Sequence, residues 1–153
     1  MKSKTLVSLA VWLAAGAVCF AANPQMGTWK LNEKKSKLGH GMGKNSTVVY
    51  ESGFFKTKVT IDGTDAKGKP MHSEWSGNFD GKDYAVTGDP TSDMRSYSKV
   101  DDRTLTFTAK KGGKVTITGR IVVAADGKSR TVHATGTYSK GKKFHNVVVY
   151  DKA

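Results

Sequence analysis

The sequence Met-Gly-Thr-Trp-Lys-Leu-Asn, residues 26–32, decides how the rest of the chain is interpreted. Gly27 stands two positions before Trp29, and the indole enters a segment in which apolar and polar residues alternate, as they do in a half-buried β-strand. A tryptophan in this position is expected to be buried. By itself the pattern fits a buried anchor at the start of any β domain, so the remaining residues have to define the fold.

Residues 1–21 have the three parts of a secretory signal peptide. Two lysines precede an apolar run from Leu6 to Phe20, and small residues follow at the end of the segment. The run is too short to span a membrane comfortably. We therefore expect cleavage after Ala21 and a periplasmic or secreted protein with one domain, residues 22–153. An uncleaved signal anchor is the alternative.

The expected mature chain keeps 132 of the 153 residues, enough for one domain with its own core. The only cysteine, Cys19, leaves with the signal, so the domain has to be stabilised by its core and its hydrogen bonds. The formal net charge of the whole chain is +12. Such a charge favours association with anionic lipid, polysaccharide or nucleic acid, but it does not specify a fold.

From Ser46 onward the chain predicts a series of β-strands rich in Val, Ile, Thr, Tyr and Phe, separated by turns that contain Gly or Asp. No helical periodicity appears, and the glycines between Gly39 and Gly43 argue against a helix after the first strand. Strand and turn repeated without a long crossover indicate an antiparallel meander.

Hairpin geometry predicts which residues share a face, because cross-strand partners point to the same side of a sheet. A type I′ turn at Asp126-Gly127 would pair Val123 with Arg130 and Ile121 with Val132. Turns at 140–142, 80–81, 52–53 and 111–113 predict four further pairs: Val132 with Tyr150, Trp75 with Val86, Tyr50 with Phe55, and Phe107 with Ile117.

These pairs give one apolar face and one face of Thr, Lys, Ser and His, which is what an antiparallel sheet closed on itself requires. We expect an all-β antiparallel up-and-down barrel of about eight to ten strands. The Asp101-Asp102 hairpin is ambiguous, since an even loop turns Ser98 inward and an odd loop turns Tyr97 inward. Val147 and Val149 fall on the outer face without an evident reason.

Motifs at both ends of the chain resemble the calycins, the superfamily that contains the lipocalins and the fatty-acid-binding proteins. Gly27-Thr28-Trp29 is similar to their Gly-x-Trp opening, whose Trp plugs one end of a β-barrel. Val148-Val149-Tyr150 resembles the last strand of a fatty-acid-binding protein, where Arg-x-Tyr holds a ligand carboxylate, but Val148 replaces the Arg. The basic, Gly-containing segment Glu33–Lys44 departs from a two-helix lid. The resemblance implies a loop-covered, calycin-type barrel of a bacterial lipocalin-like family.

Arg130 is the first candidate for a ligand contact. The predicted register puts it on the inner face near Tyr150, and a buried guanidinium must find an anion or several acceptors. With Tyr150 it could replace the missing carboxylate clamp, or it could lie at the barrel rim with its charge in water.

Inward aromatic side chains are expected to line the interior, either as a cavity wall or as a packed core. They are Tyr138, Trp75, Tyr84, Phe107, Phe55 and Phe144. Inward glycines, Gly77, Gly119 and Gly136, leave volume unfilled and favour a cavity slightly, although a strand glycine can also mark a bend.

Catalysis, metal binding, cofactors and nucleic acid are not expected. There is no Gly-x-Ser-x-Gly motif, and the aspartates stand where turns favour Asp. The four histidines do not have the spacing of a metal site. The lysines gather in loops while the aromatic residues point inward, unlike a surface that stacks bases.

The sequence therefore predicts a secreted or periplasmic barrel that binds a small apolar or amphipathic molecule in its interior, with no transmembrane segment in the mature chain. The alternative is a packed barrel whose cationic loops, chiefly Glu33–Lys44, dock on an anionic envelope polymer or a partner protein.

Overall fold

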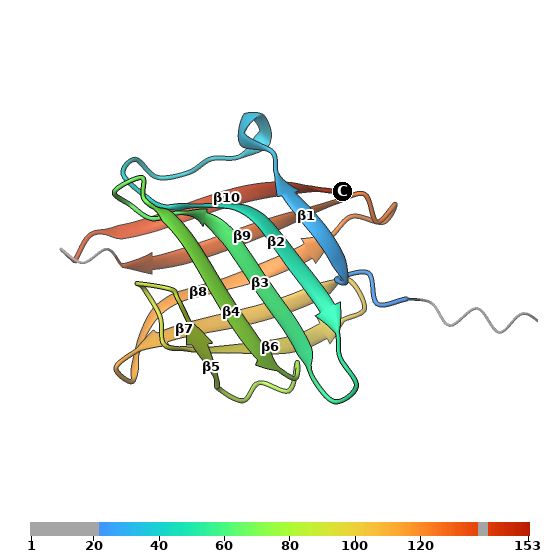
Figure 1. The fold of residues 1–153 in the computed structure, drawn as a ribbon. Helices are drawn as coiled ribbons and strands as arrows, with labels where there is room; N and C mark the ends of the chain where they lie inside the picture. The colour runs from blue at the N-terminus through green and yellow to red at the C-terminus, as the bar shows by residue number, and fades with distance from the viewer. Residues whose placement is uncertain (1–21, 138–140) are drawn as a thin grey trace, which may run out of the picture.

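The computed structural model describes residues 22–137 and 141–153, which form a closed antiparallel β-barrel (Figure 1). The strands are β1 (Gly27–Leu31), β2 (Lys44–Ser52), β3 (Thr57–Thr64), β4 (Pro70–Gly77), β5 (Tyr84–Thr87), β6 (Met94–Asp101), β7 (Thr104–Lys111), β8 (Lys114–Val123), β9 (Ser129–Thr137) and β10 (Lys143–Lys152). A 3-10 helix, η1 (Glu33–Lys35), follows β1. The predicted signal peptide and Tyr138 lie outside the described residues.

The ten strands follow one another around the barrel in chain order, and β1 closes the ring by pairing with β10 (Figure 1). This arrangement confirms the predicted all-β up-and-down barrel. Closure gives each described strand two hydrogen-bonded neighbours, although β5 pairs over only two residues with each of β4 and β6. No described strand is therefore left at a free edge of the sheet.

The β8–β9 hairpin has the predicted register. Val123 pairs with Arg130 and Ile121 with Val132. The predicted type I′ turn is wrong, because only Gly127 has a positive φ and its N–H donates to the Ala124 carbonyl. A four-residue loop built on this turn gives the same register as a two-residue loop, so the faces are unchanged.

The β9–β10 register differs from the prediction by two residues. Tyr150 pairs with Arg130, and Val132 pairs with Val148. The strands resume only at Lys143, so the connection is longer than the three residues that the sequence led us to expect. A slip of two residues keeps every side chain on its predicted face.

The β7–β8 hairpin also slips by two residues, and Phe107 faces Gly119 instead of Ile117. Its turn consists of Gly112 and Gly113, both with positive φ, as the mirror-image hairpin turns require. A bulge after Ala109 takes up the remaining residue.

The β2–β3 prediction is wrong for Phe55. The strands separate after Ser52 and resume at Thr57. The four residues between them form a tip on which Phe54 is 94% and Phe55 82% exposed. Phe55 therefore does not line the interior and is not the partner of Tyr50.

The ambiguity at the β6–β7 hairpin is settled by a bulge between Lys99 and Asp101. Tyr97 pairs with Phe107 and is 3% exposed, so Tyr97 points inward. Leu105, which the even loop would have buried, is also buried at 1% exposure. The extra residue in the bulged strand lets both side chains reach the core.

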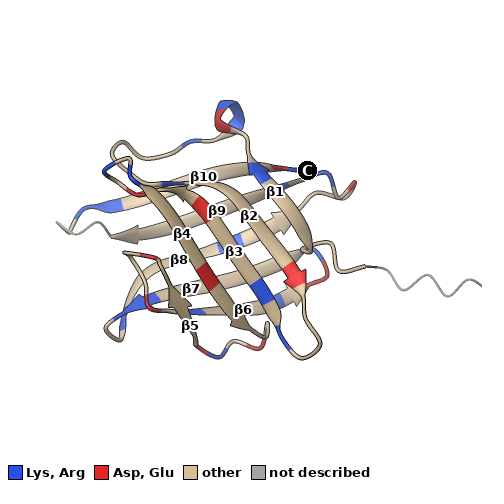
Figure 2. Cartoon of the chain, in the orientation of Figure 1, with Lys and Arg blue, Asp and Glu red and all other residues tan. Residues whose placement is uncertain are grey.

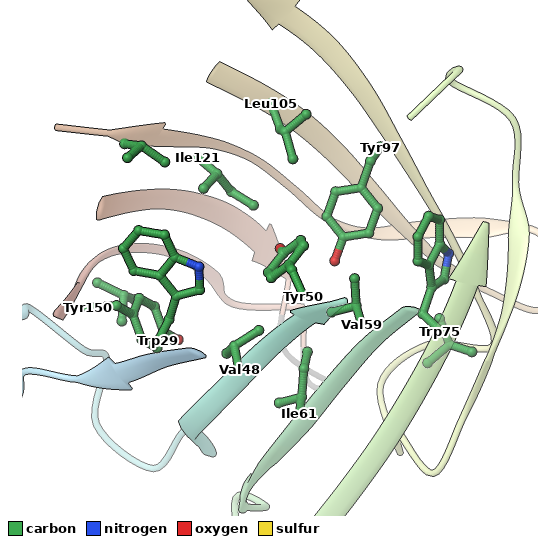
Figure 3. Close-up of a cluster of buried hydrophobic side chains, with 13 residues drawn as sticks. Trp29, Val48, Tyr50, Val59, Ile61, Trp75, Tyr97, Leu105, Ile121 and Tyr150 are labelled. Atoms are coloured by element: carbon green, nitrogen blue, oxygen red, sulfur yellow. The ribbon is translucent and has the colours of Figure 1, made fainter. Parts of the chain in front are cut away.

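The core lies between two tryptophans, with Tyr50 and Tyr97 between them (Figure 3). Trp29 is fully buried, and its Nε1–H donates to the Gln25 carbonyl oxygen at 2.9 Å. The Gln25 side chain in turn donates to the Arg103 carbonyl oxygen. Trp29 and the turn before β1 thus close the end of the barrel where the β6–β7 and β8–β9 hairpins lie.

The inward glycines do not leave empty space, contrary to the expectation. A Cβ on Gly119 would lie 2.4 Å from the Phe107 ring, and one on Gly136 would lie 2.7 Å from the Phe144 ring. A Cβ on Gly77 would collide with Tyr84. Each glycine instead lets an aromatic ring from the adjacent strand approach the barrel wall closely.

The segment that follows β1 stays attached to β10. Lys37 and Val147 exchange both backbone hydrogen bonds, and the Ser36 hydroxyl accepts from the Val149 N–H. Val147 and Val149, which point outward, are only half-buried beside this segment. Among the described residues, no helix has the length and hydropathy needed to cross a membrane.

Candidate ligand-binding site

Arg130 lies inside the closed end of the barrel, at the beginning of β9, and is 2% exposed. Its guanidinium carbon lies 4.7 Å from the ring centre of Tyr50, 4.9 Å from that of Trp29 and 5.1 Å from that of Tyr150. Rings from β1, β2 and β10 therefore surround the cation. The expectation that Arg130 could reach water at the rim is wrong.

This aromatic cage, Trp29, Tyr50 and Tyr150, leaves two nitrogens of Arg130 unpartnered. Nε and Nη1 are buried without a hydrogen-bond acceptor. No carboxylate among the described residues forms an ion pair with Arg130. A desolvated cation–π contact recovers about 0.5–2 kcal/mol, whereas a buried unpaired donor costs about 1–3 kcal/mol. The site thus keeps an unused capacity to donate to an anion.

The hydroxyls near Arg130 are also donors. Burial raises the pKa of Tyr150 to about 12, although the Arg130 charge acts in the opposite direction. Burial and the neighbouring Tyr97 raise the pKa of Tyr50, again against Arg130. Both phenols therefore remain protonated at neutral pH. The cage presents a fixed positive charge and O–H donors, with no acid to neutralise them.

A second buried guanidinium, that of Arg95 on β6, differs from Arg130 because it is paired with an acid. Its Nη2 lies 3.0 Å from Oδ2 of Asp89, and both side chains are about one-tenth exposed. Burial alone would raise the pKa of Asp89, but hydrogen bonds from Ser92 and Thr91 in the same loop outweigh it, and the pKa falls below its ordinary value. Arg95 is satisfied by the β5–β6 loop, and Arg130 has no such partner.

The predicted site residues fall into two groups. Arg130 and Tyr150 meet directly in the cage. Trp75 is buried, its ring centre lies 5.6 Å from that of Tyr84, and Phe107 joins them through Tyr97. Tyr84 is half-buried and its hydroxyl donates to Asp80 at the barrel surface, so Tyr84 lies at the margin of this second group.

Three interior residues were not predicted as site residues, although Tyr50 was placed on the inner face and Tyr97 was one of two alternatives. Tyr50 completes the cage, and Tyr97 connects the two groups through edge-on contacts with Tyr50 and Trp75. Arg95 points inward because it is two positions from Tyr97 on the same strand. The odd reading of the Asp101-Asp102 hairpin would have placed both Tyr97 and Arg95 inside, so the signal was present but undecided.

The interior is packed unevenly. The side of β2–β6 and the closed end are buried, whereas four inward apolar residues on β7–β10 remain half-buried: Phe107, Ile117, Val132 and Phe144. The Phe107 and Phe144 rings lie against glycines of the wall rather than across the barrel. This wall is therefore apolar, inward-facing and incompletely covered.

The end opposite Trp29 is covered by the segment between η1 and β2. Asn146 on β10 is 6% exposed; its Oδ1 accepts from the Gly39 N–H at 2.9 Å, and its Nδ2 lies 3.1 Å from the Met42 sulfur. Leu38 packs against the core. A buried asparagine thus holds a glycine-containing loop across the mouth, as expected for a barrel without a helical lid.

Other features of the described residues do not form a competing site. No three of their His, Cys, Asp or Glu side chains are grouped to hold a metal ion. One open hollow, of about 540 Å³, lies beside the β3–β4 and β5–β6 connections, and another, of about 350 Å³, lies over β8, β9 and β10. Neither hollow is lined by Arg130 or by its cage.

Comparison with solved structures finds a likeness to redesigned β-barrels. One, the redesigned β-barrel mFAP1 bound to DFHBI, is 18% identical with a TM-score of 0.44; the match covers 86% of this chain and 98% of that one. Another redesigned β-barrel is 13% identical with a TM-score of 0.45, covering 89% of this chain and 97% of that one. No protein-family model and no curated protein matches this chain.

Proposed function

We propose that this protein binds a small amphipathic molecule with an acidic head group inside the barrel, and that it is a binding protein rather than an enzyme. The observation that carries the proposal is the buried Arg130 guanidinium, which has two unpartnered nitrogens and no acidic partner. A carboxylate placed there would gain hydrogen bonds to a charged group, worth about 1.5–3 kcal/mol each. The Tyr150 hydroxyl is the second donor.

The path to Arg130 supports the same proposal. Along β9 the inward side chains become smaller from Arg130 to Val132 and Ala134, toward the mouth of the barrel, where the Phe144 ring lies over Gly136. The half-buried apolar wall of β7–β10 lies along this path. An acyl chain or ring would cover that wall while its head group reached the cage.

Binding of a long-chain fatty acid and of its alcohol analogue tests the proposal, with Trp29 fluorescence as the reporter because its ring borders Arg130. Arg130→Gln should weaken binding of the acid by roughly tenfold to a hundredfold and leave the alcohol nearly unaffected. Lys152→Gln is the matched control: it removes one positive charge 5.2 Å from the same indole, and it should leave both affinities unchanged.

Equal losses of acid and alcohol in Arg130→Gln would mean that the arginine supports the wall and does not recognise a head group. Equal losses of acid binding in Arg130→Gln and Lys152→Gln would indicate an unspecific effect of charge. If the parent protein bound neither probe, the packed barrel with external docking would be the better account.

We further propose that the protein is exported after cleavage behind Ala21. The support is the sequence of residues 1–21 alone, with its charged start, apolar run and small residues. N-terminal sequencing of the protein recovered from outside the cytoplasm should begin at Ala22, and a protein beginning at Met1 would overturn the proposal.

A further inference from the structure

The outer face of β7–β9 contains no acid and carries the cations Lys110 and Arg120. From Arg103 to the end of the chain only Asp126 and Asp151 are acidic, out of thirteen acids in total. Asp126 lies in the β8–β9 turn, and Asp151 is held by Asn32 near the end of β10. Acids that lie within strands occur mainly on β2–β4 (Figure 2).

The same face carries an array of hydroxyl groups. Strand alternation turns these threonines outward, and we call them the threonine face: Thr106, Thr108, Thr116, Thr118, Thr131, Thr135 and Thr137. Thr118 pairs with both Thr108 and Thr135 across neighbouring strands, and its hydroxyl oxygen lies 3.2 Å from that of Thr135. Hydroxyls from three strands thus stand side by side.

Cationic and imidazole groups border this array. Arg120 lies directly opposite His133, and the His133 and His145 ring centres are 6.0 Å apart. Lys143 lies opposite Thr137 at the start of β10. Within the described residues, neither Arg120 nor Lys143 forms an ion pair, whereas Lys110 at the edge of β7 is paired with Asp83 at 2.7 Å.

The threonine face is also hollowed. The hollow of about 350 Å³ over β8–β10 is lined by Thr116, Thr118, Thr135, Thr137 and Lys143, together with Val115, Gly136 and Phe144. Its volume lies at the lower end of the range typical of small-ligand pockets, which is about 300–1,000 Å³. Four threonines and a lysine along one side of the hollow offer hydroxyl groups and a positive charge to a hydroxylated, negatively charged unit, while Val115 and Phe144 give it an apolar floor.

The chemistry of this surface narrows the class of polyanion. Single-stranded nucleic acid is held by aromatic side chains on which bases stack, and the outward positions of β7–β9 carry no aromatic ring other than imidazole. A membrane surface would require a large apolar face to insert, and only Val115 and Val122 are exposed there. Hydroxyl groups and unpaired cations instead match the hydroxyls and carboxylates of an acidic sugar polymer.

We propose that the threonine face, with Arg120 and Lys143, is a docking surface for an acidic polysaccharide. The cations pair with carboxylates spaced along the polymer, and the threonine hydroxyls exchange hydrogen bonds with the sugar hydroxyls over the hollow. The threonine hydroxyls, Arg120 and Lys143 point away from the barrel interior and lie apart from the Glu33–Lys44 loop, and only the floor of the hollow, at Gly136 and Phe144, belongs to the inner wall. The inference therefore does not depend on the proposed internal ligand.

Affinity for a polyuronate, measured at low and at moderate salt, tests this inference. The variant Arg120→Gln/Lys143→Gln should weaken binding roughly threefold to tenfold at low salt and flatten its salt dependence. The matched control, Lys34→Gln/Lys35→Gln, removes the same two charges from η1 and should change binding less than about twofold.

A second variant keeps the charge and removes the hydroxyls. Thr118→Val/Thr135→Val should remain folded, because valine favours β-strands as threonine does, and it should weaken polyuronate binding about twofold to tenfold through the lost hydrogen bonds. Circular dichroism of each variant checks the fold, and melting confirms that it is stable at the binding temperature.

Four results would overturn the inference. The parent protein could fail to bind the polyuronate, or the η1 variant could lose as much affinity as the Arg120/Lys143 variant. The valine variant could bind as tightly as the parent, which would leave only unspecific charge attraction. A single-stranded oligonucleotide or vesicles containing phosphatidylglycerol could bind more tightly than the polyuronate.

Discussion

Replacing Arg130 with methionine should separate stability from ligand binding. The substitution Arg130→Met keeps a long, flexible side chain among the rings of Trp29, Tyr50 and Tyr150 but removes the charge and the unpaired donors. In the parent protein, two unpaired buried donors cost about 2–6 kcal/mol together, and three cation–π contacts return about 1.5–6 kcal/mol. The two terms nearly cancel, and the methionine gains contacts of its sulfur with the rings.

We therefore expect the free energy of unfolding of Arg130→Met to lie within about 1 kcal/mol of the parent or to exceed it, as is common when a buried charge is replaced by an apolar group of similar size. Urea unfolding followed by tryptophan fluorescence measures this difference. Arg130→Ala is the comparison, because it leaves a cavity and should cost about 2–5 kcal/mol.

A loss of 3 kcal/mol or more in Arg130→Met, about the loss expected for the alanine variant, would refute the reasoning. It would show that the guanidinium itself holds the closed end of the barrel together and that the cage is a structural anchor. A neutral or stabilised methionine variant that no longer distinguishes a fatty acid from its alcohol would instead mark Arg130 as a residue kept for binding.

Three further predictions follow from the packing. Trp29→Ala should lower the free energy of unfolding by roughly 3–5 kcal/mol, and a melting temperature within a degree or two of the parent would contradict its role as the barrel plug. Asp89→Asn should lower the free energy of unfolding by about 3–5 kcal/mol because it leaves the buried Arg95 without its anionic partner. Asp83→Asn removes the partner of Lys110 in a more exposed pair and should lower it by at most about 1 kcal/mol. Because the folded-state pKa of Asp89 lies below its unfolded value, its stabilising effect is present above the unfolded pKa and lost as the pH falls through the folded one. Urea titrations of parent and Asp89→Asn should therefore converge in acid, and a difference that persists there would contradict the assignment. Replacing Phe54 and Phe55 with serine should change stability by less than about 0.5 kcal/mol each, and a larger loss in thermal melting would show that the β2–β3 tip packs against something.

The register errors show why the sequence predicts faces better than partners. The slips in β7–β8 and β9–β10 are each two residues, so Phe107 and Tyr150 point inward as expected although their cross-strand partners differ. Loop length and bulges decide the partner, and both depend on backbone strain that side-chain pattern does not reveal. The prediction that Phe55 points inward is wrong because the β2–β3 turn is longer than expected. Phe55 therefore lies in the turn and not in a strand.

Part of the candidate site could be predicted because alternation along a strand fixes the face of each side chain. Arg130 and Tyr150 follow from alternation along two strands, and any even slip brings them onto one face. The cage needed Tyr50 from β2, which meets Arg130 only because the barrel closes through β1. Sequence reasoning that proceeds hairpin by hairpin reaches adjacent strands but not the far side of a closed ring.

The seam between β1 and β10 differs from every other seam, because it joins segments from opposite ends of the chain. Each of the other strand pairs can form next to the turn that connects its two strands, so only a short loop is closed. The β1–β10 pair instead has to bring distant residues together after the other strands have paired. We infer that a partly folded chain is an open sheet with two unsatisfied edges, β1 and β10. A chain paused at that stage would be able to donate its β1 to a neighbouring copy, so exchange of the first strand between molecules is the misassembly to which this topology is most exposed.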